Sequence, residues 1–263
     1  MVKNWYMLMK STLIFLNGYY DQRYPEFYKQ EIAWGLENSY PLICADGGVR
    51  LFRDLNQAHG THFCPNVLIG DLDSIDEITA VVEQLRQSST HIVREWIGKV
   101  DKDYTDGQLA VAYAIEECDS HEVLIYGGLP RPNEYETDHF WGNLKLMRFG
   151  LRLFENRSHA EPRRERAWKT EMRDPLQTIH FVVSNLRLER KNAGLQRVSL
   201  VAEHEDVVVE RSTDLRWDLA ALRVDPDLTN ALRNEFVADA DCAMIRLVEG
   251  SNPVYIIHNW YEM

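Results

Sequence analysis

The chain has 263 residues, a formal net charge of -12 at pH 7 and a sequence pI near 5.2. A chain of this length predicts one or two domains. Hydrophobic residues make up 45% and aromatic residues 11% of the composition, which excludes a disordered chain, because disorder requires a shortage of residues that gain from burial. The acidic balance argues against a general nucleic-acid-binding protein, whose affinity depends on Lys and Arg that neutralise phosphates.

The lengths of the apolar runs and the spacing of the cysteines both indicate the cellular location. No apolar run approaches the roughly 18 residues of a membrane span, and the run at 12–16 is too short for the core of a signal peptide. We therefore expect a cytoplasmic protein without a membrane partner. The four cysteines form no C-x-x-C pair, which predicts reduced structural thiols rather than a disulfide framework. They are Cys44, Cys64, Cys118 and Cys242.

The first 150 residues alternate short apolar runs with longer amphipathic segments. The short runs predict strands at 13–16, 42–45, 67–69, 91–93 and 123–126. The longer segments predict helices at 25–36, 49–55, 75–86, 106–118 and 139–149. Ser74 with Glu77, and Thr105 with Gln108, have the spacing of capping boxes. This alternation predicts an α/β fold, a mainly parallel sheet with flanking helices.

The pattern changes twice after this region. A mixed-charge stretch at 155–174 predicts a solvated linker or surface insertion, although its arginines leave contact with a polyanion open. Short β-rich pieces follow at 180–183, 198–202, 207–210, 243–248 and 254–258. They predict a small all-β sandwich or barrel. We therefore divide the chain into an α/β domain at 1–155, a charged linker or insertion at 156–177 and a β-sandwich domain at 178–263.

Aspartates follow the predicted parallel strands, at the point where each strand ends. Asp46 follows the second strand, and Asp71 and Asp73 follow the third. The set continues after the fourth strand and before the last helix, with Asp101, Asp103, Asp106 and Asp138. Each alone is consistent with a turn or a helix cap. Together they predict one acidic crevice, because the carboxyl ends of parallel strands converge, and such a cluster suits Mg²⁺.

Glycine pairs lie at two of the same strand ends. Gly47 and Gly48 follow Asp46, and Gly127 and Gly128 close the fifth strand. Their backbone amides can approach phosphate oxygens closely. The chain has no G-x-x-x-x-G-K-[ST], no G-x-G-x-x-G and no G-x-S-x-G. These features indicate metal-assisted phosphate chemistry without a covalent nucleophile.

Five segments together resemble the thiamine pyrophosphokinase family. They are CADGGVRLF at 44–52, IGDLDSI at 69–75, KDYTDGQLA at 102–110, YGGL at 126–129 with TDHFWGNL at 137–144, and DLRWDL at 214–219. The resemblance implies transfer of a diphosphate group from ATP to the hydroxyl of thiamine, with Mg²⁺. It also implies a homodimer in which an α/β domain binds ATP and the β-sandwich domain binds thiamine and dimerises.

The resemblance assigns roles to individual residues. It makes Asp46, Asp71, Asp73 and Asp103 the positions that organise Mg²⁺ and the ATP phosphates, and it places Asp138 near the transferred group. The catalytic set is therefore Asp71, Asp73, Asp103 and Asp138, in which Asp73 or Asp103 accepts the proton. The nucleotide-binding set adds Gly47, Gly48, Thr105, Asp106, Gly127, Gly128 and Arg131. The resemblance also implies that Trp217 and Asn234 contact thiamine, and the aromatic face of Trp217 suits a cationic thiazolium ring.

Three positions depart from the family pattern. An expanded segment at 127–139 moves Arg131 away from the glycine pair, and Leu51 occupies the usual arginine position with Arg50 one place earlier. Arg233 replaces a serine, so a cation lies near a cationic substrate. Two alternatives therefore stay open, namely another hydroxymethyl heterocycle such as a pterin as acceptor, or a catalytically silent module that binds a nucleotide or thiamine. Nucleic-acid binding through residues 157–173 is a third.

Overall fold

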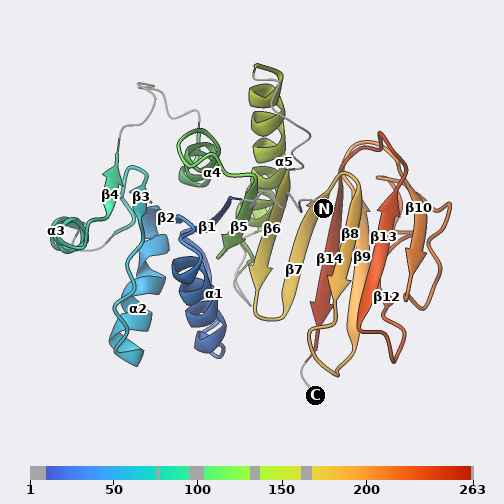
Figure 1. Ribbon diagram of the computed structural model, residues 1–263, viewed down its shortest axis with the longest axis horizontal. Helices are drawn as coiled ribbons and strands as arrows, with labels where there is room; N and C mark the ends of the chain where they lie inside the picture. The colour runs from blue at the N-terminus through green and yellow to red at the C-terminus, as the bar shows by residue number, and fades with distance from the viewer. Residues whose placement is uncertain (1–9, 76–77, 95–103, 131–136, 161–167, 262–263) are drawn as a thin grey trace, which may run out of the picture. The chain divides into compact units, whose positions relative to one another are not determined.

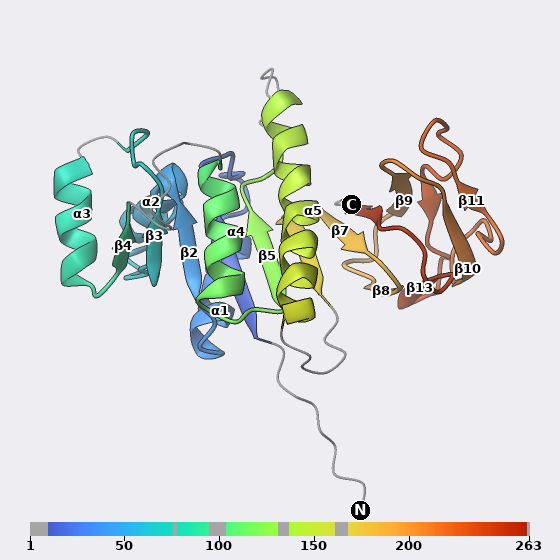
Figure 2. The ribbon, with the colours of Figure 1, turned by 90° about the horizontal axis from the view of Figure 1, so that it is seen from above.

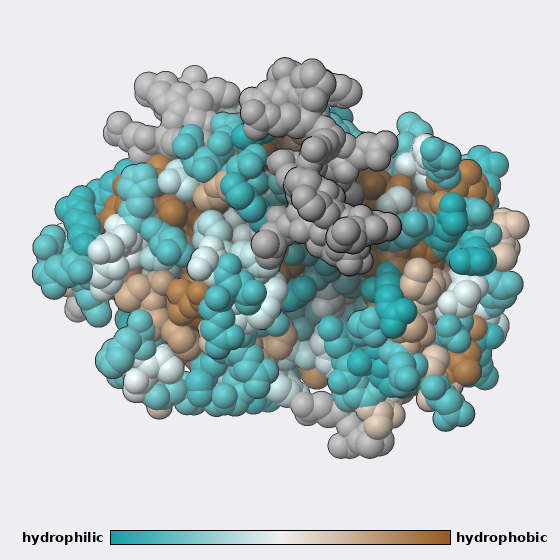
Figure 3. Space-filling model, in the orientation of Figure 1, coloured by the Kyte–Doolittle hydropathy of each residue, from teal (hydrophilic) through white to brown (hydrophobic). Residues whose placement is uncertain are grey.

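The computed structural model describes residues 10–75, 78–94, 104–130, 137–160 and 168–261 (Figure 1). The chain forms two compact units, Met1–Thr170 and Glu171–Met263. All four cysteines are free thiols, as predicted. In the described helices, no stretch combines the length and apolar character that crossing a bilayer requires. The face in Figure 3 is largely hydrophilic with separate small apolar patches.

The N-terminal unit contains five parallel strands in the order β5-β1-β2-β3-β4. The strands are β1 (Ser11–Phe15), β2 (Leu42–Ala45), β3 (Val67–Ile69), β4 (His91–Val93) and β5 (Glu122–Tyr126). The predicted bounds of β2, β3 and β4 are confirmed, and those of β1 and β5 differ by at most two residues. The short apolar runs are strands because both faces of this sheet are buried.

Helices cover both faces of these strands. They are α1 (Pro25–Glu37), α2 (Val49–His59), α3 (Ile78–Gln87), α4 (Asp106–Glu116) and α5 (Thr137–Ala160), with a 3-10 turn, η1 (Asp46–Gly48), before α2. Tyr28, Phe52 and Leu85 of α1, α2 and α3 share one apolar layer with Leu13 and Phe15 of β1. Figure 2 shows α4 and α5 together on one side of the strands. The predicted α/β class is confirmed.

Strand order reverses between β1 and β5. The chain proceeds outward from β1 through β2 and β3 to β4, and then returns to place β5 on the other side of β1. Ligands of such open sheets bind at the carboxyl ends of the strands, near the position of this reversal. The turns after β1, β2, β3 and β5 therefore define where a site is expected.

Helix α5 is longer than predicted, since it continues through Gly150 to Ala160. A Cβ atom at Gly150 would lie 2.6 Å from the ring of Trp168, so this glycine makes room for an indole and does not end the helix. Phe154 also packs on Trp168, with ring centroids 5.3 Å apart. At the other end of the expected linker, β6 (Lys169–Asp174) is a strand. These described parts of 156–177 therefore form regular structure.

The C-terminal unit has two hydrogen-bonded sets of strands in the orders β12-β9-β14-β7-β6 and β11-β10-β13-β8. Beyond β6 the strands are β7 (Gln177–Val182), β8 (Asn185–Glu189), β9 (Gln196–Ala202), β10 (Val207–Thr213), β11 (Arg223–Val224), β12 (Asn234–Glu235), β13 (Cys242–Leu247) and β14 (Val254–Trp260). Leu200 and Ile256 from the first set share a core with Leu188 and Ile245 from the second. The predicted sandwich is confirmed, with β6, β8, β11 and β12 not predicted.

Candidate metal centre

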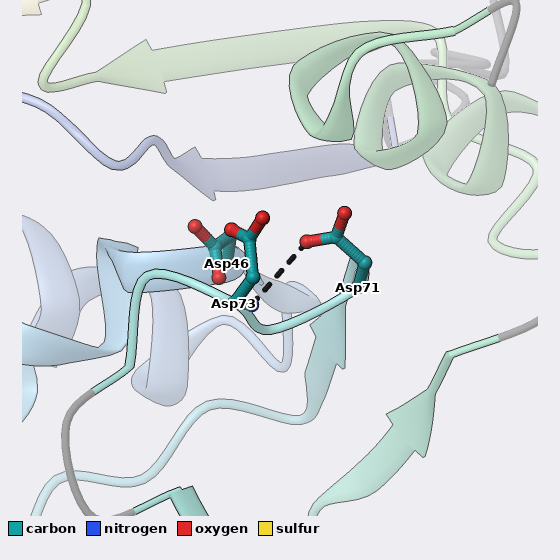
Figure 4. Close-up of side chains that lie close together, drawn as sticks. All are labelled: Asp46, Asp71 and Asp73. Carbon is teal, nitrogen blue, oxygen red and sulfur yellow. Dashed lines mark hydrogen bonds between the residues drawn. The ribbon is translucent and has the colours of Figure 1, made fainter.

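Three predicted aspartates come together at the carboxyl ends of β2 and β3 (Figure 4). Asp46, Asp71 and Asp73 each offer a carboxylate oxygen, and these oxygens all lie within 4.8 Å of one another. Within the described ranges this is the one group of three or more metal-binding side chains. The strands β2 and β3 are parallel neighbours, which brings the two turns to one edge. Three carboxylates this close suit a hard divalent cation.

Asp46 is the buried member of the cluster, with 2% of its surface exposed. Its φ of 45° is left-handed, an uncommon conformation for a residue other than glycine. The Oδ2 atom accepts a hydrogen bond from Nδ2 of Asn17 at 3.2 Å. The buried Oδ1 atom has no hydrogen-bond partner among the described residues. An ionised carboxylate in this position is costly unless a cation compensates it, so the residues present fit a bound metal.

The turn after β3 exposes two carboxylates around a buried leucine. Gly70 and Leu72 have φ values of 135° and 66°, and Leu72 is buried with 1% exposure. This backbone turns Leu72 into the core and leaves Asp71 and Asp73 exposed. The amide of Asp73 donates to Oδ1 of Asp71 at 3.3 Å, and Ser74 Oγ donates to Asp73 at 3.2 Å. The sequence D-L-D-S thus presents both acids on one side.

Asp106 adds a fourth negative charge at the start of α4. Burial raises the pKa of its carboxyl from 3.8 to about 6, and the charges of Asp71, Asp46 and Asp73 add to the rise. A Cβ atom at Gly70 would lie 2.7 Å from Oδ1 of Asp106, so this carboxyl packs on the β3 turn. Burial is the main cause of the raised pKa, and the smaller contributions of the three aspartates place Asp106 within their electrostatic reach.

Thr105 caps the helix that carries Asp106. Its Oγ1 accepts the amide of Gln108 at 3.3 Å, and Oε1 of Gln108 accepts the amide of Thr105 at 2.9 Å. The predicted capping box is confirmed. The other predicted box is untested, because Glu77 lies outside the described residues. Ser74 donates instead to Asp73, as given above.

One glycine of each pair packs closely against the end of β1 or the chain that follows it. A Cβ atom at Gly48 would overlap the carbonyl oxygen of Phe15, and one at Gly127, whose φ is 73°, would lie 2.7 Å from the ring of Tyr20. The carbonyl of Gly128 accepts Nδ2 of Asn143 at 3.0 Å. These glycines therefore allow close backbone packing, which the sequence prediction of phosphate contact did not include. The phosphate contact itself stays a prediction.

Other predicted residues lie apart from the three aspartates or outside the described residues. Asp103 and Arg131, and also Asp101, belong to the undescribed segments. Asp138 is exposed in the first turn of α5, where its carboxylate accepts the amide of His139 at 2.9 Å. It is not a member of the group of three.

The predicted thiamine contacts lie in the C-terminal unit. Trp217 is 50% exposed, and the Arg216 guanidinium lies over its ring at 4.7 Å from the centroid. Asn234 is buried. Arg233 is exposed with a φ of 62°. Glu235 pairs with Arg216 at 2.8 Å, so the carboxylate that follows Arg233 is occupied by another cation.

Two arginines of the predicted polyanion contact lie in the described part of the chain, and both are engaged within it. Arg157 donates to the carbonyl of Ile115 and pairs with Asp119 at 3.3 Å. Arg173 pairs with the buried Glu171 at 2.8 Å. Both arginines therefore pair with acidic groups of this chain, and the other arginines of this stretch lie outside the described residues.

Asn17 is the contact to the cluster that the sequence analysis missed. It lies just after β1, so the available signal was a polar side chain at the same sheet edge as the aspartates. Arg50, noted only as a displaced arginine, donates to Oδ1 of this asparagine.

Comparison with known proteins gives a family match and a fold match. Residues 35–153 match the family model described as "Thiamin pyrophosphokinase, catalytic domain", a range that holds Asp46, Asp71 and Asp73. A solved thiamine pyrophosphokinase from Bacillus subtilis is 18% identical, with a TM-score of 0.66 over 97% of this chain and 100% of that chain. The yeast thiamin pyrophosphokinase is 19% identical, with a TM-score of 0.69 over 96% and 87%. The Candida albicans enzyme is 11% identical, with a TM-score of 0.66 over 96% and 90%. No curated protein sequence matches. At these identities the solved structures establish the fold.

Proposed function

We propose that this chain, which belongs to the thiamine pyrophosphokinase family through its catalytic domain at residues 35–153, transfers a diphosphate group from ATP to the hydroxyl of thiamine. The family resemblance of the motifs agrees with this match. The observation that carries the proposal is the cluster of Asp46, Asp71 and Asp73 around a buried carboxylate oxygen that has no hydrogen-bond partner among the described residues. Such a cluster suits a divalent cation, and ATP is used in cells with one.

We propose Mg²⁺ as the cation, held by Asp46, Asp71 and Asp73, with Asp103 as a further ligand. When bound, Mg²⁺ neutralises triphosphate charge and polarises the transferred group. The hydroxyl oxygen of thiamine forms a bond to the β-phosphorus, and the bond from this phosphorus to the oxygen of AMP breaks. The hydroxyl proton goes to a carboxylate oxygen of Asp73 or Asp103.

We further propose that the C-terminal unit supplies the thiamine contacts. The half-exposed indole of Trp217 offers an aromatic face of the kind that attracts a cationic ring. Arg216 already lies over this ring at 4.7 Å, so thiamine would use the remaining area. We propose a homodimeric assembly on family resemblance alone, and a cytoplasmic location on the apolar runs and cysteines of the sequence.

The test is product analysis after incubation of the full chain with ATP, Mg²⁺ and thiamine. AMP and thiamine diphosphate in equal amounts are expected. Asp71→Asn should lower turnover at least about 100-fold, since metal ligation contributes several kcal/mol to the transition state. Asp54→Asn is the matched control, because Asp54 is a half-exposed acid on α2 that pairs with its neighbour Arg53.

Three outcomes would contradict the proposal. An active Asp71→Asn variant would remove the acidic cluster from the mechanism. AMP formed with a pterin but not with thiamine would keep the chemistry and replace the acceptor. Tight binding of Mg-ATP without AMP from any acceptor would favour the silent binding module.

A further inference from the structure

A neutral amide joins an arginine to the buried acid of the cluster. Asn17 donates from Nδ2 to Oδ2 of Asp46 at 3.2 Å, and its Oδ1 accepts a hydrogen bond from Nη2 of Arg50. Arg50 also donates from Nε to the carbonyl of Gly47 at 3.2 Å. The guanidinium of Arg50 thus folds back over the turn that carries Asp46. The three side chains form a continuous chain of hydrogen bonds.

The glycine after Asp46 is shaped for this pair. A Cβ atom at Gly47 would overlap Oδ1 of Asn17 and would lie 2.5 Å from Nη2 of Arg50. Any side chain at this position would displace the asparagine from the arginine. Glycine at this position therefore leaves room for Asn17 and Arg50 to meet over its Cα atom.

We propose that Asn17 and Arg50 are positioning residues that orient the Asp46 carboxylate for its cation. This inference rests on the cation site of the proposed function. An amide has one accepting and one donating end. Because Arg50 occupies the accepting end of Asn17, the donating end faces Asp46.

The neutral spacer matters for the charge of the site. A direct ion pair between Arg50 and Asp46 would cancel the negative charge that a cation requires. The amide of Asn17 satisfies one oxygen of Asp46 without adding a positive charge beside it. The buried Oδ1 of Asp46 stays without a hydrogen-bond partner in the described part of the chain. The arrangement holds an ionised carboxylate in one orientation and keeps an oxygen for the metal.

A competing role for Arg50 is direct contact with a phosphate, in place of the family arginine at Leu51. The geometry favours the positioning role, because Nε and Nη2 of Arg50 both donate within the protein. In the positioning role, Arg50 contributes to metal affinity in the absence of nucleotide. In the phosphate-contact role, it contributes only to ATP affinity. They are therefore separable by experiment.

The experiment is titration of the full chain with Mn²⁺ alone. Electron paramagnetic resonance measures the concentration of free Mn²⁺ at each step. Asn17→Ala and Arg50→Gln should each weaken Mn²⁺ binding about 10-fold or more, as loss of partners that orient metal ligands does elsewhere. The double variant should bind no more weakly than the weaker single variant, because both changes break one chain of hydrogen bonds. Arg53→Gln removes the same charge one turn later on α2 and should leave Mn²⁺ affinity unchanged.

Melting temperatures test whether each variant folds. Because Asn17 is exposed, Asn17→Ala should fold as the wild type does. Unchanged Mn²⁺ affinity in Asn17→Ala would overturn the inference. Arg50→Gln that binds Mn²⁺ normally but ATP weakly would assign Arg50 to the phosphate instead. A wild-type chain that binds Mn²⁺ with these effects yet forms no thiamine diphosphate would contradict only the proposed reaction. A wild-type chain that binds no Mn²⁺ would overturn both.

Discussion

The buried amide of Asn234 holds the backbone of Trp217 by two hydrogen bonds. Its Oδ1 accepts the amide of Trp217 at 3.1 Å, and its Nδ2 donates to the carbonyl of the same residue at 2.7 Å. The indole itself is 50% exposed. The exposed indole of Trp217 is therefore attached to a backbone that two hydrogen bonds hold in place. A preorganised aromatic contact requires such support.

Asn234→Ala should weaken thiamine binding about 10-fold, because the backbone of Trp217 loses both hydrogen bonds and the ring loses its fixed position. The free energy of unfolding should also fall by about 1–3 kcal/mol, the usual cost of buried polar groups left unpaired. Calorimetry with thiamine and urea denaturation measure the two effects. Asn230→Ala is the control, since this exposed amide makes one backbone contact, to Arg223 at 2.7 Å. Unchanged thiamine affinity in Asn234→Ala would separate Trp217 from the acceptor site.

Asp106→Asn should raise the melting temperature of the metal-free protein above pH 6. The pKa of Asp106 is raised from 3.8 to about 6, so the folded state holds this proton more tightly than the unfolded state does. Its destabilising effect is absent below pH 3.8 and grows as the pH rises through 6. Melting curves in a chelator from pH 4 to pH 8 measure this difference. The variant and the wild type should converge near pH 4, and a constant difference at all pH values would refute the electrostatic explanation.

Thr105→Ala should destabilise the N-terminal unit by about 1 kcal/mol, because the N-terminus of α4 loses its side-chain acceptor. Chemical denaturation measures the change. Thr105→Ser keeps the hydroxyl and should retain most of the stability. Gln108→Ala breaks the other half of the same capping box, and the two changes should not be additive. Equal losses in the Ala and Ser variants would argue against the capping role.

His258 should make the protein sensitive to acid. Burial lowers the pKa of this histidine from 6.5 to about 3, with further lowering by His180, Lys191 and Arg190. Between these pH values the unfolded chain binds a proton that the folded chain does not bind. The free energy of unfolding should therefore decrease as the pH falls below 6.5, by at most about 1.4 kcal/mol per pH unit.

His258→Gln keeps a donor for Oε1 of Gln196, which lies 2.8 Å from Nε2 of His258. This variant should lack that share of the pH dependence. Urea denaturation at several pH values from 4.5 to 7 compares the slopes. Identical slopes in the variant and the wild type would assign the acid sensitivity to other groups.

Much of the N-terminal fold was predictable, because buried parallel strands are continuous apolar runs that end at a charge or turn residue. The extension of α5 was not, since the sequence from Glu155 is dense in charge and its apolar contact is the distant Trp168. β8 did carry a signal that was overlooked. Its residues alternate between exposed and buried, with Leu186 and Leu188 pointing inward.

The acidic cluster was predictable for a topological reason, because strand ends of a parallel sheet meet at one edge. The role of Asn17 was not, since its contact with Asp46 spans 29 residues and depends on the exact approach of β1 to β2. The packing of Gly48 and Gly127 was also missed. A glycine that faces a ligand and one that faces another backbone segment have the same sequence signal.

The two turns that carry Asp46, Asp71 and Asp73 belong to strands that are neighbours both in the chain and in the sheet. The two strands are joined by one local connection, which contains α2. A cation bound to the three aspartates would link the end of β2 to the end of β3. Cation binding should therefore slow amide hydrogen exchange mainly in β2, β3 and α2. The exchange rates of the β-sandwich should stay unchanged.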